Sequence, residues 1–478
     1  VESGFLYVLG SPYEVITNSW YAYFKDRYTA ENALRQQPGN TSIKVKNKRN
    51  LPISEVKISP DGLKILYATN EIGRFKVYMH DTRAGKRELI FSEGFRNAFQ
   101  ATDYEYPLLA WNPNNNEIAI MYERRDVIKL LTYDLSTKKT NISDLAPDYQ
   151  RVHSMGYVNP MTLVLSGTSR GFSDIFLYYL NTRQSERITN DFYDDLDATF
   201  VQLRGRRGIL FASNRENPLL QSAPRLDSIM PVGNFDIYYF DLDTRDKELI
   251  PITQTPLANE RQPVPIDTSL CAYLSDRSGL FNRETAYLED YIHHYEQIVK
   301  LKDGSEYIFH ADSAIAGIDS QAIDTIRLHP VLKKRAVQYS STNLNRSIEG
   351  HSVSPRTGKI AELVFLDNQY RIYHGALAID TLAAAAPTLF QQSRREKNKD
   401  RPVEERPLPA PSNIFEELPA PEIKEEDIPV EKLDTGKIDI DNYLFQSEFD
   451  DEDVPPTVIP REDKKDEKPE APSPVTKI

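Results

Sequence analysis

The first candidate for chemistry is a serine motif. Gly167-Thr168-Ser169-Arg170-Gly171 matches the Gly-x-Ser-x-Gly pattern, in which a serine on a sharp strand-to-helix turn is the nucleophile of acyl transfer. The next residues, Phe172-Ser173-Asp174-Ile175-Phe176, are typical of a strand and not of a helix. Its serine and arginine recur at Ser213/Arg215 and Ser275/Arg277, and no α/β-hydrolase domain comes after the repeats to supply an aspartate and a histidine. We therefore interpret the motif as a repeated turn and expect no catalytic residue.

Two groups of residues have the types that bind metals. His293-His294-Tyr295-Glu296 brings two imidazoles and a carboxylate together, but adjacent histidines on a strand point to opposite faces, which defeats shared coordination. The acidic run Asp191–Asp197 and the pair Asp439/Asp441 lack the glycine and terminal glutamate of an EF-hand loop. We expect turn-capping carboxylates there, with calcium at Asp194, Asp195 or Asp197 as the alternative. No His-Glu-x-x-His and no glycine-rich phosphate loop occurs, so we expect neither a metal nor a cofactor.

Five arginines are candidates for binding a partner, because they recur in equivalent turns. They are Arg124, Arg125, Arg170, Arg215 and Arg277. If these turns close one face of a ring, the side chains could form a cationic site suited to a peptide carboxylate. The alternative, which we favour, is that each arginine makes local hydrogen bonds to its own turn and to the neighbouring repeat.

The composition excludes several classes of protein. The 478 residues carry a net charge of −13, which argues against a nucleic-acid surface. Residues 391–478 hold 24 acidic and 14 basic residues, so most of this charge belongs to the tail. No run of 18 apolar residues is present, which excludes a membrane-spanning helix. The single cysteine, Cys271, lies in an apolar run and is expected to be a buried structural thiol.

The elements that would position these residues begin with helices. The chain starts at Val1 without Met or a signal segment, so we expect a piece of a longer protein. Ser11-Pro12-Tyr13-Glu14 is predicted to be a capping box, and a second short helix is predicted to start at Thr29 and to stop before Pro38-Gly39. We interpret residues 1–40 as the helical end of a preceding domain, packed on the outside of the repeats that come after it.

Residues 51–380 contain a repeated pair of strands with a tight turn between them. Val56–Tyr67 shows it around Ser59-Pro60-Asp61-Gly62, and Leu108–Met121, Met155–Leu165 and Val353–Phe365 repeat it. A second phrase, Ser-x-Arg-x-Gly followed by Asp-Ile-Tyr or its like, completes units of four strands. We count six units, with five or seven as alternatives, starting near Pro52, Tyr106, Val152, Asp194, Asn259 and Arg346. Stacked radially, such units cover both faces of each sheet, and an insertion with a His293–His310 hairpin is expected in the fifth.

The end of the chain has a different character. Fourteen of the 31 prolines lie from Pro387 onward among Glu, Asp and Lys, so we predict that residues 387–478 are disordered. One apolar island, Ile438–Phe449, alternates apolar and polar residues and could add as a strand to another sheet. Its candidate partner-binding residues are Tyr443, Leu444, Phe445 and Phe449; a chance apolar cluster in a linker is the alternative. Changing Tyr443 and Phe445 to serine together is predicted to abolish partner capture.

These phrases resemble the TolB-type, WD-like repeat of bacterial envelope proteins. The resemblance covers about residues 51–379 and is strongest at Ser59-Pro60-Asp61-Gly62, Ser169–Phe176, Ile188-Thr189-Asn190 and Asp236-Ile237-Tyr238. It implies an all-β fold, a six-bladed TolB-like β-propeller with a short N-terminal helical segment and a disordered C-terminal tail. The whole arrangement also looks like large envelope proteins of the Bacteroidota, in which a metallopeptidase-like helical region precedes such a propeller.

The resemblance also carries the expectation for function. It implies a periplasmic or outer-membrane-associated, non-catalytic scaffold that binds other cell-envelope proteins or peptides, with an outer-membrane component as a further candidate partner. Two alternatives stay open. One is an accessory domain that gates or delivers substrate to a metallopeptidase, whose His-Glu-x-x-His would lie upstream of Val1. The other is a carbohydrate- or lipid-binding propeller, which would show exposed aromatic pairs around one pocket.

Overall fold

The structure is a computed structural model of the whole chain, and it is mostly β. It describes residues 2–39, 41–43, 45, 51–96, 102–145, 148–220, 233–313, 315, 317–379 and 386–399. The island at residues 438–449 and the rest of the tail from residue 400 lie outside the described residues. Among the described residues, no helix combines the length and the apolar character needed to cross a membrane.

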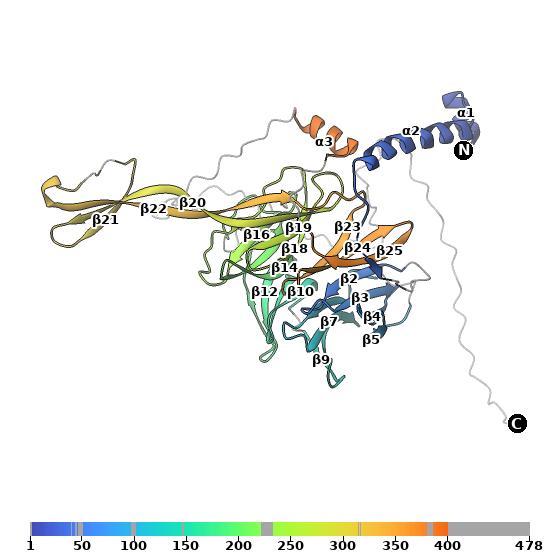
Figure 1. Cartoon of the computed structure of the whole chain (residues 1–478), viewed down its shortest axis with the longest axis horizontal. Helices are drawn as coiled ribbons and strands as arrows, with labels where there is room; N and C mark the ends of the chain where they lie inside the picture. The colour runs from blue at the N-terminus through green and yellow to red at the C-terminus, as the bar shows by residue number, and fades with distance from the viewer. Residues whose placement is uncertain are drawn as a thin grey trace, which may run out of the picture. The chain divides into compact units, whose positions relative to one another are not determined.

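The described strands form six antiparallel sheets (Figure 1). The first three are β2(Ile53–Ile58) to β5(Arg87–Glu93) with β3(Lys64–Glu71) and β4(Arg74–Asp81) between, then β6(Leu108–Trp111), β7(Glu117–Arg124), β8(Val127–Asp134) and β9(Thr140–Asp144), then β10(Arg151–Asn159), β11(Thr162–Ser169), β12(Phe172–Tyr179) and β13(Gln184–Arg187). The fourth holds β14(Asp195–Leu203), β15(Arg206–Ser213), β16(Asp236–Asp241) and β17(Ile250–Pro251). The fifth holds β18(Glu260–Pro265), β19(Leu270–Ser275), β20(Asn282–Leu301) and β21(Glu306–His310), with β22(Ile323–Ser340) paired to β20. The sixth holds β23(Ile348–Ser354), β24(Lys359–Leu366), β25(Gln369–Ala376) and β1(Thr41–Ile43).

The sheets are arranged in a closed ring. Their first strands contact one another in the order β2, β6, β10, β14, β18 and β23, and β23 then contacts β2. Buried apolar clusters fill the spaces between successive sheets, including the space between the sixth sheet and the first, where Ile43, Ile53, Tyr67 and Leu363 pack together. The predicted β-propeller fold is confirmed by this topology, and each predicted start of a unit lies within two residues of the start of a first strand.

The repeated turn explains why the strand pairs form where the sequence predicted them. The Ser59 hydroxyl donates to Asp61 Oδ1 at 2.5 Å, and the same carboxylate accepts from the Leu63 N–H at 2.9 Å. Gly62 adopts a φ of +66°, a left-handed conformation that a side chain would strain. The turn thus satisfies its own polar groups and fixes the register of β2 and β3.

The ring is closed by a strand that lies outside the predicted propeller boundary. Residues Thr41–Ile43 form β1, which pairs with β25 as the fourth strand of the sixth sheet. The predicted start at residue 51 was therefore wrong by one strand. Three residues carry no readable alternation, so only their tertiary partners identify them as a strand.

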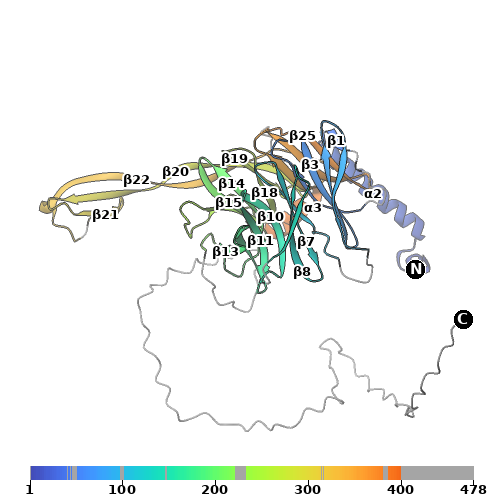
Figure 2. The same ribbon diagram turned by 90° about the horizontal axis from the view of Figure 1, so that it is seen from below.

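The predicted insertion in the fifth unit is a long ribbon, here called the arm (residues 288–336). β20 pairs with β19 only over its first residues, Asn282–Tyr287, and then continues with β22 beyond that sheet. Figures 1 and 2 show β20 and β22 extending away from the ring, with β21 at the distal end. The sequence predicted a hairpin here but neither its length nor its third strand.

The N-terminal helices differ from the prediction in two ways. α1 spans Glu2–Leu9, and α2 runs without interruption over Tyr13–Ala33, so no second helix begins at Thr29. The predicted capping box does not form either, because Pro12 occupies the N-cap position and no side chain caps it. No residue of α2 is buried, and its contact with the ring lies at its C-terminal end, where the Gln36 N–H donates to Asn343 O at 2.7 Å.

A third helix forms where the disordered tail was predicted to begin. α3 spans Leu389–Lys399, which corrects the predicted boundary at residue 387. Gln391 is buried and its Nε2 donates to Leu257 O at 3.1 Å, while Arg395 donates to Arg277 O at 2.8 Å. These contacts with the fifth-sheet region supply the stability that the polar sequence alone does not reveal.

Candidate functional site

Irregular first strands bring polar residues to the axis of the ring. Five of the six first strands shift register against their second strands, leaving Ser54, His153, Asp197, Gln262 and Glu349 at or within the bulges. Asp197 and Gln262 have positive φ angles of 56° and 51°. A bulge changes the direction of the side chains beside it, and here each bulge of a first strand holds a polar residue.

Five titratable residues lie on the first strands of four sheets, and we call them the axial cluster (Glu55, Lys57, Asp197, Arg261 and His351). Lys57 Nζ lies 2.8 Å from Glu55 Oε1, and Arg261 Nε donates to Asp197 Oδ2 at 2.6 Å. His351 Nε2 lies 2.7 Å from Gln262 O. Each carboxylate of the cluster thus has a cation beside it: Glu55 of the first sheet has Lys57, and Asp197 of the fourth sheet has Arg261.

The pKa values in the axial cluster follow from burial and these pairs. Burial raises the pKa of Glu55 above its usual value, and Lys57 only partly offsets this effect. Burial also raises the pKa of Asp197, but the charge and hydrogen bond of Arg261 outweigh it, and the net shift is downward. Burial and the nearby Arg283 lower the pKa of His351 to about 3, which keeps this imidazole neutral. The cluster is an internally paired network that joins the sheets at the centre.

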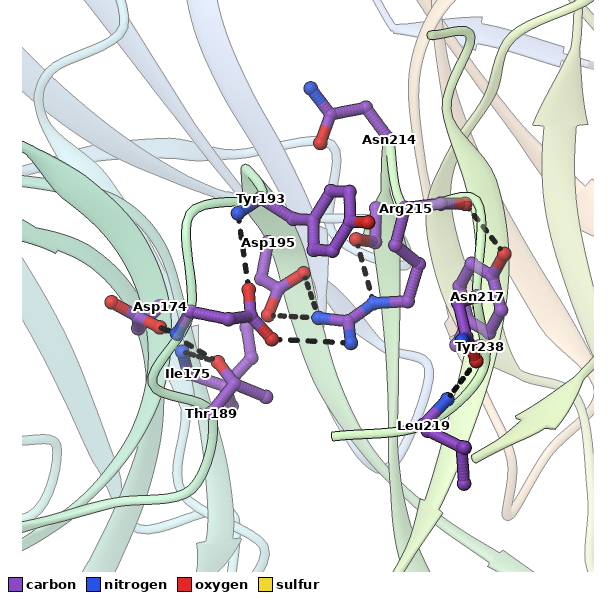
Figure 3. Close-up of polar contacts among 12 residues, drawn as sticks. Asp174, Ile175, Thr189, Tyr193, Asp195, Asn214, Arg215, Asn217, Leu219 and Tyr238 are labelled. Atoms are coloured by element: carbon purple, nitrogen blue, oxygen red, sulfur yellow. Dashed lines mark hydrogen bonds and ion pairs between the residues drawn. The ribbon is translucent and has the colours of Figure 1, made fainter. Parts of the chain in front are cut away.

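A second polar cluster lies between the third and fourth sheets and contains one of the predicted arginines (Figure 3). Arg215 is buried, and its Nη2 donates to both carboxylate oxygens of Asp195 at 2.8 Å. Its Nη1 lies 3.3 Å from Asp191 Oδ2, an ion pair without good hydrogen-bond geometry. Tyr193 lies under the guanidinium, with the ring centroid at 5.3 Å.

The same cluster is the one group of carboxylates in the described part of the chain close enough to share an ion. Asp174, Asp191 and Asp195 place one oxygen each within 4.8 Å of one another. Arg187 pairs with Asp174, and Arg215 pairs with the other two, so guanidinium groups occupy the positions where a cation would compensate the charge. Burial raises the pKa of Asp174 to about 6 despite Arg187. The arrangement fits an interblade ion network, and it does not favour calcium.

The other predicted arginines do not share a partner with Arg215. Arg124 lies 3.3 Å from Glu93, and Arg277 lies 2.8 Å from Glu284. Arg125 and Arg170 are exposed turn residues with positive φ angles of 53° and 57°. The ion pairs that the structure describes for Arg124, Arg215 and Arg277 are local, and a role of the five arginines in binding a partner stays a prediction.

The serine motif is part of a hairpin. Ser169 ends β11, and β12 begins at Phe172, so a strand comes after the turn. Ser169 is buried, whereas a nucleophile must be reachable by substrate. Cys271 is buried as predicted, and burial raises the pKa of its thiol to about 12.

The arm leaves large apolar side chains uncovered, as α1 and α2 also do. Seven large side chains on it are between 45 and 65% exposed, namely Ile292, Tyr295, Tyr307, Ile308, Ile326, Leu328 and Leu332. Among the described strands, β22 pairs with β20 alone, so no strand is paired to its other edge, although β17 contacts β22 near the ring. The middle of this edge is unfavourable for pairing with another strand, because it carries Pro330, Lys333 and Lys334, residue types that are common on edge strands.

A groove of about 790 Å³ lies at the base of the arm. It runs between the outer strands of the fourth sheet and the arm, with Ile250, Thr253, Tyr291, Lys333 and Gln338 among its lining residues. Lys333 Nζ lies 2.9 Å from Glu248 Oε1 across it. The inner part of β22 therefore lines this groove, whereas residues 323–329 of the same strand do not.

Comparisons with known proteins give likenesses of fold. No family model matches the sequence, and a search of the curated proteins finds no match. TolB from Acinetobacter baumannii is similar with 18% identity and a TM-score of 0.38 over 50% of this chain and 52% of that chain, so the match spans about half of its length. A putative TolB from Agrobacterium tumefaciens has 14% identity and a TM-score of 0.34, covering 68% of this chain and 90% of that one. The β-propeller domain of the Trilobed protease from Pyrococcus furiosus has 10% identity and a TM-score of 0.36, covering 70% and 100%.

Sequence reasoning missed the axial cluster, the groove and the free edge. The sequence suggests Asp197 only as a possible cation ligand, and the bulge that turns it to the axis has no signature in the sequence. The expectation that His293 and His294 point to opposite faces was also wrong. Register shifts between Ile292 and His294, so His293 lies in a bulge, and its Nδ1 lies 2.8 Å from His294 Nδ1. The rule that adjacent strand residues face apart therefore does not hold at this position.

Proposed function

We propose that this chain is a non-catalytic scaffold that binds another protein through the arm, the ring serving as its rigid base. The observation that supports the proposal is the combination of an unpaired strand edge and exposed apolar side chains on one element. A two-stranded ribbon gains little stability by itself, so large apolar groups on it are costly unless something covers them.

The outer part of the β22 edge is the best place for a partner. Over residues 323–329 the strand carries Ile326 and Leu328, which are 48 and 65% exposed, and it lacks the proline and lysines of the middle part. An extended segment of a partner can add there as a strand, since backbone hydrogen bonds supply affinity and alternate side chains supply register. The class of partner is therefore a protein with an extended, apolar-alternating segment.

The cell envelope is the location that we propose for this binding. This part of the proposal depends on the resemblance of the repeats to TolB-type proteins, and partners would accordingly be envelope proteins or peptides. The tail island with Tyr443, Leu444, Phe445 and Phe449 stays a second predicted contact, separate from the arm.

The test is site-specific photo-crosslinking of the full chain in envelope extracts. A photoreactive side chain at Leu328 should give one dominant crosslinked partner, and Leu328→Asp should reduce capture of that partner at least tenfold in a pull-down. The matched control is Leu89, which is 51% exposed on β5, an outer strand elsewhere on the ring. Equal crosslinking at the two positions, or full capture by Leu328→Asp, would contradict the proposal.

A further inference from the structure

Four of the eight histidines of this chain lie on the arm. They are His293, His294, His310 and His329. His293 and His294 belong to β20, His310 ends β21, and His329 belongs to β22. Imidazole is the side chain that first-row transition ions such as Zn²⁺ bind most often, so a local gathering of this kind is a candidate metal site.

The strand register places three of these four histidines, His294, His310 and His329, on one face of the arm. Glu296 is paired with His310 on one side and with His329 on the other, and directly paired residues in an antiparallel sheet point to the same face. His294 lies two residues before Glu296 and shares that face. Its ring stacks on the ring of His310, with centroids 5.0 Å apart and an angle of 9° between planes.

The bulge adds His293 to the group. His293 Nδ1 lies 2.8 Å from His294 Nδ1, so one of these nitrogens must carry the proton and the other must accept it. Two ligand nitrogens on a tetrahedral Zn²⁺ are separated by about 3.4 Å, given a Zn–N distance of about 2.0–2.1 Å. A small widening of the pair would therefore admit an ion, and the shared proton would leave to solvent.

Carboxylates next to the rings favour the state that binds a metal. His294 Nε2 lies 3.5 Å from Glu296 Oε1, and His310 Nδ1 lies 3.7 Å from Asp312 Oδ2. A carboxylate at one ring nitrogen holds the proton there and leaves the other nitrogen as a ligand, as in known carboxylate–histidine–zinc arrangements. By this rule the ligand atom of His294 is Nδ1. His310 Nδ1 accepts a hydrogen bond from the Asp312 N–H at 3.4 Å, so the Asp312 carboxylate does not hold a proton at that nitrogen.

We infer that the arm binds one transition-metal ion of the Zn²⁺ class through His293, His294 and His310, with Glu296 as a positioning residue. The three ligand atoms are not yet gathered within coordination distance. The imidazole of His310 is 49% exposed, so it can rotate toward the pair without disturbing a core. The ligands come from β20 and β21 and the proposed protein-binding edge belongs to β22, but the two adjoin, because Glu296 is directly paired with His329 at the end of that edge.

The test is Zn²⁺ binding to the full chain without a histidine tag, measured by calorimetry and by metal analysis after equilibrium dialysis. We expect one ion per chain with micromolar or tighter affinity, and no comparable binding of Mg²⁺, which prefers oxygen ligands. The double variant His294→Gln/His310→Gln should bind at least a hundredfold more weakly. Glu296→Gln should cost about 10–100-fold, the usual effect of losing such an outer partner.

Two matched controls separate the site from general imidazole or carboxylate effects. His80→Gln/His374→Gln removes two half-buried histidines of the ring, and Glu289→Gln removes an arm carboxylate that pairs with Arg335. Both should bind Zn²⁺ as the unchanged chain does, and all variants should melt alike in chelator. The inference is overturned if the unchanged chain takes up no Zn²⁺, if His294→Gln/His310→Gln retains full affinity, or if the controls lose it equally.

Discussion

Arg215 is enclosed by carboxylates and aromatic rings, and this environment predicts the cost of removing it. Arg215→Met would leave Asp191 and Asp195 buried without their cation, which destabilises a protein by roughly 3–5 kcal/mol. Arg124→Met is the matched change at a predicted arginine whose side chain is 50% exposed, and it should cost less than about 1 kcal/mol. Equilibrium unfolding in guanidinium chloride measures both. Similar free energies of unfolding for the two variants would contradict the assignment of Arg215 to a buried network.

Glu260 offers a pH test at the same scale. Burial, and after it the charge of Asp236, raise the pKa of this carboxyl to about 9, so the folded protein holds it protonated where the unfolded chain has lost the proton. The folded-state pKa is raised, so the contribution of Glu260 to stability is complete below its unfolded pKa and is lost as the pH rises toward 9. Glu260→Gln, which cannot ionise, should therefore melt at least about 2 °C above the unchanged chain at pH 8.

At pH 4 this difference should disappear, because residue 260 is then largely neutral in both the folded and the unfolded states of either chain. Thermal melts at the two pH values provide the measurement. A lower melting temperature for Glu260→Gln at pH 8 would show that the carboxylate is ionised and paired in the folded protein.

At the scale of elements, the contribution of α3 to stability can be measured separately from that of the residues after it. A chain that ends at Lys399 should melt within about 2 °C of the full chain, because the residues removed, 400–478, are rich in Pro, Glu and Asp. A chain that ends at Thr388 loses the contacts of Gln391, Arg394 and Arg395 and should melt several degrees lower. Equal melting of the two truncated chains would mean that α3 contributes no stability.

The elements also show what the sequence could and could not predict. The strand pairs were predictable because turns such as Ser59-Pro60-Asp61-Gly62 satisfy their own hydrogen bonds, which makes them local. β1 and α3 were not, because their stability comes from partners far along the chain, such as Ile372 for Ile43 and Leu257 for Gln391.

In the candidate sites, too, residue types were predictable from the sequence, whereas contacts with distant residues were not. The arginines were recognised by type, but Asp195, the partner of Arg215, lies on β14, at a position that no spacing rule identifies. The bulge at His293 reversed an argument that holds for regular strands. Side-chain direction is therefore the part of a site that sequence reasoning predicts least well when the strands are irregular.

At the scale of the whole molecule, closure of the ring depends on β1. Ile43 is 6% exposed and packs with residues of the first and sixth sheets, so Ile43→Asp places a charge in the interface between these two sheets. We expect a loss of at least about 3 kcal/mol in unfolding free energy, with the transition still cooperative. Ser42→Asp, on the exposed side of the same strand, should be nearly neutral. A loss as large for Ser42→Asp as for Ile43→Asp would contradict this role for β1.

If the ring is the base and the arm is the binding element, deletion of the arm should remove binding and leave the ring intact. Tyr291 and Lys333 are directly paired, so residues 292–332 can be replaced by an Asn-Gly turn that joins these two positions. The measurement is quantitative mass spectrometry of envelope proteins retained by the full chain and by the shortened chain, after their melting temperatures have been compared. We expect melting temperatures within about 2 °C of each other and loss of the main partner from the shortened chain. Retention of the same partner in equal yield by the shortened chain would contradict this expectation.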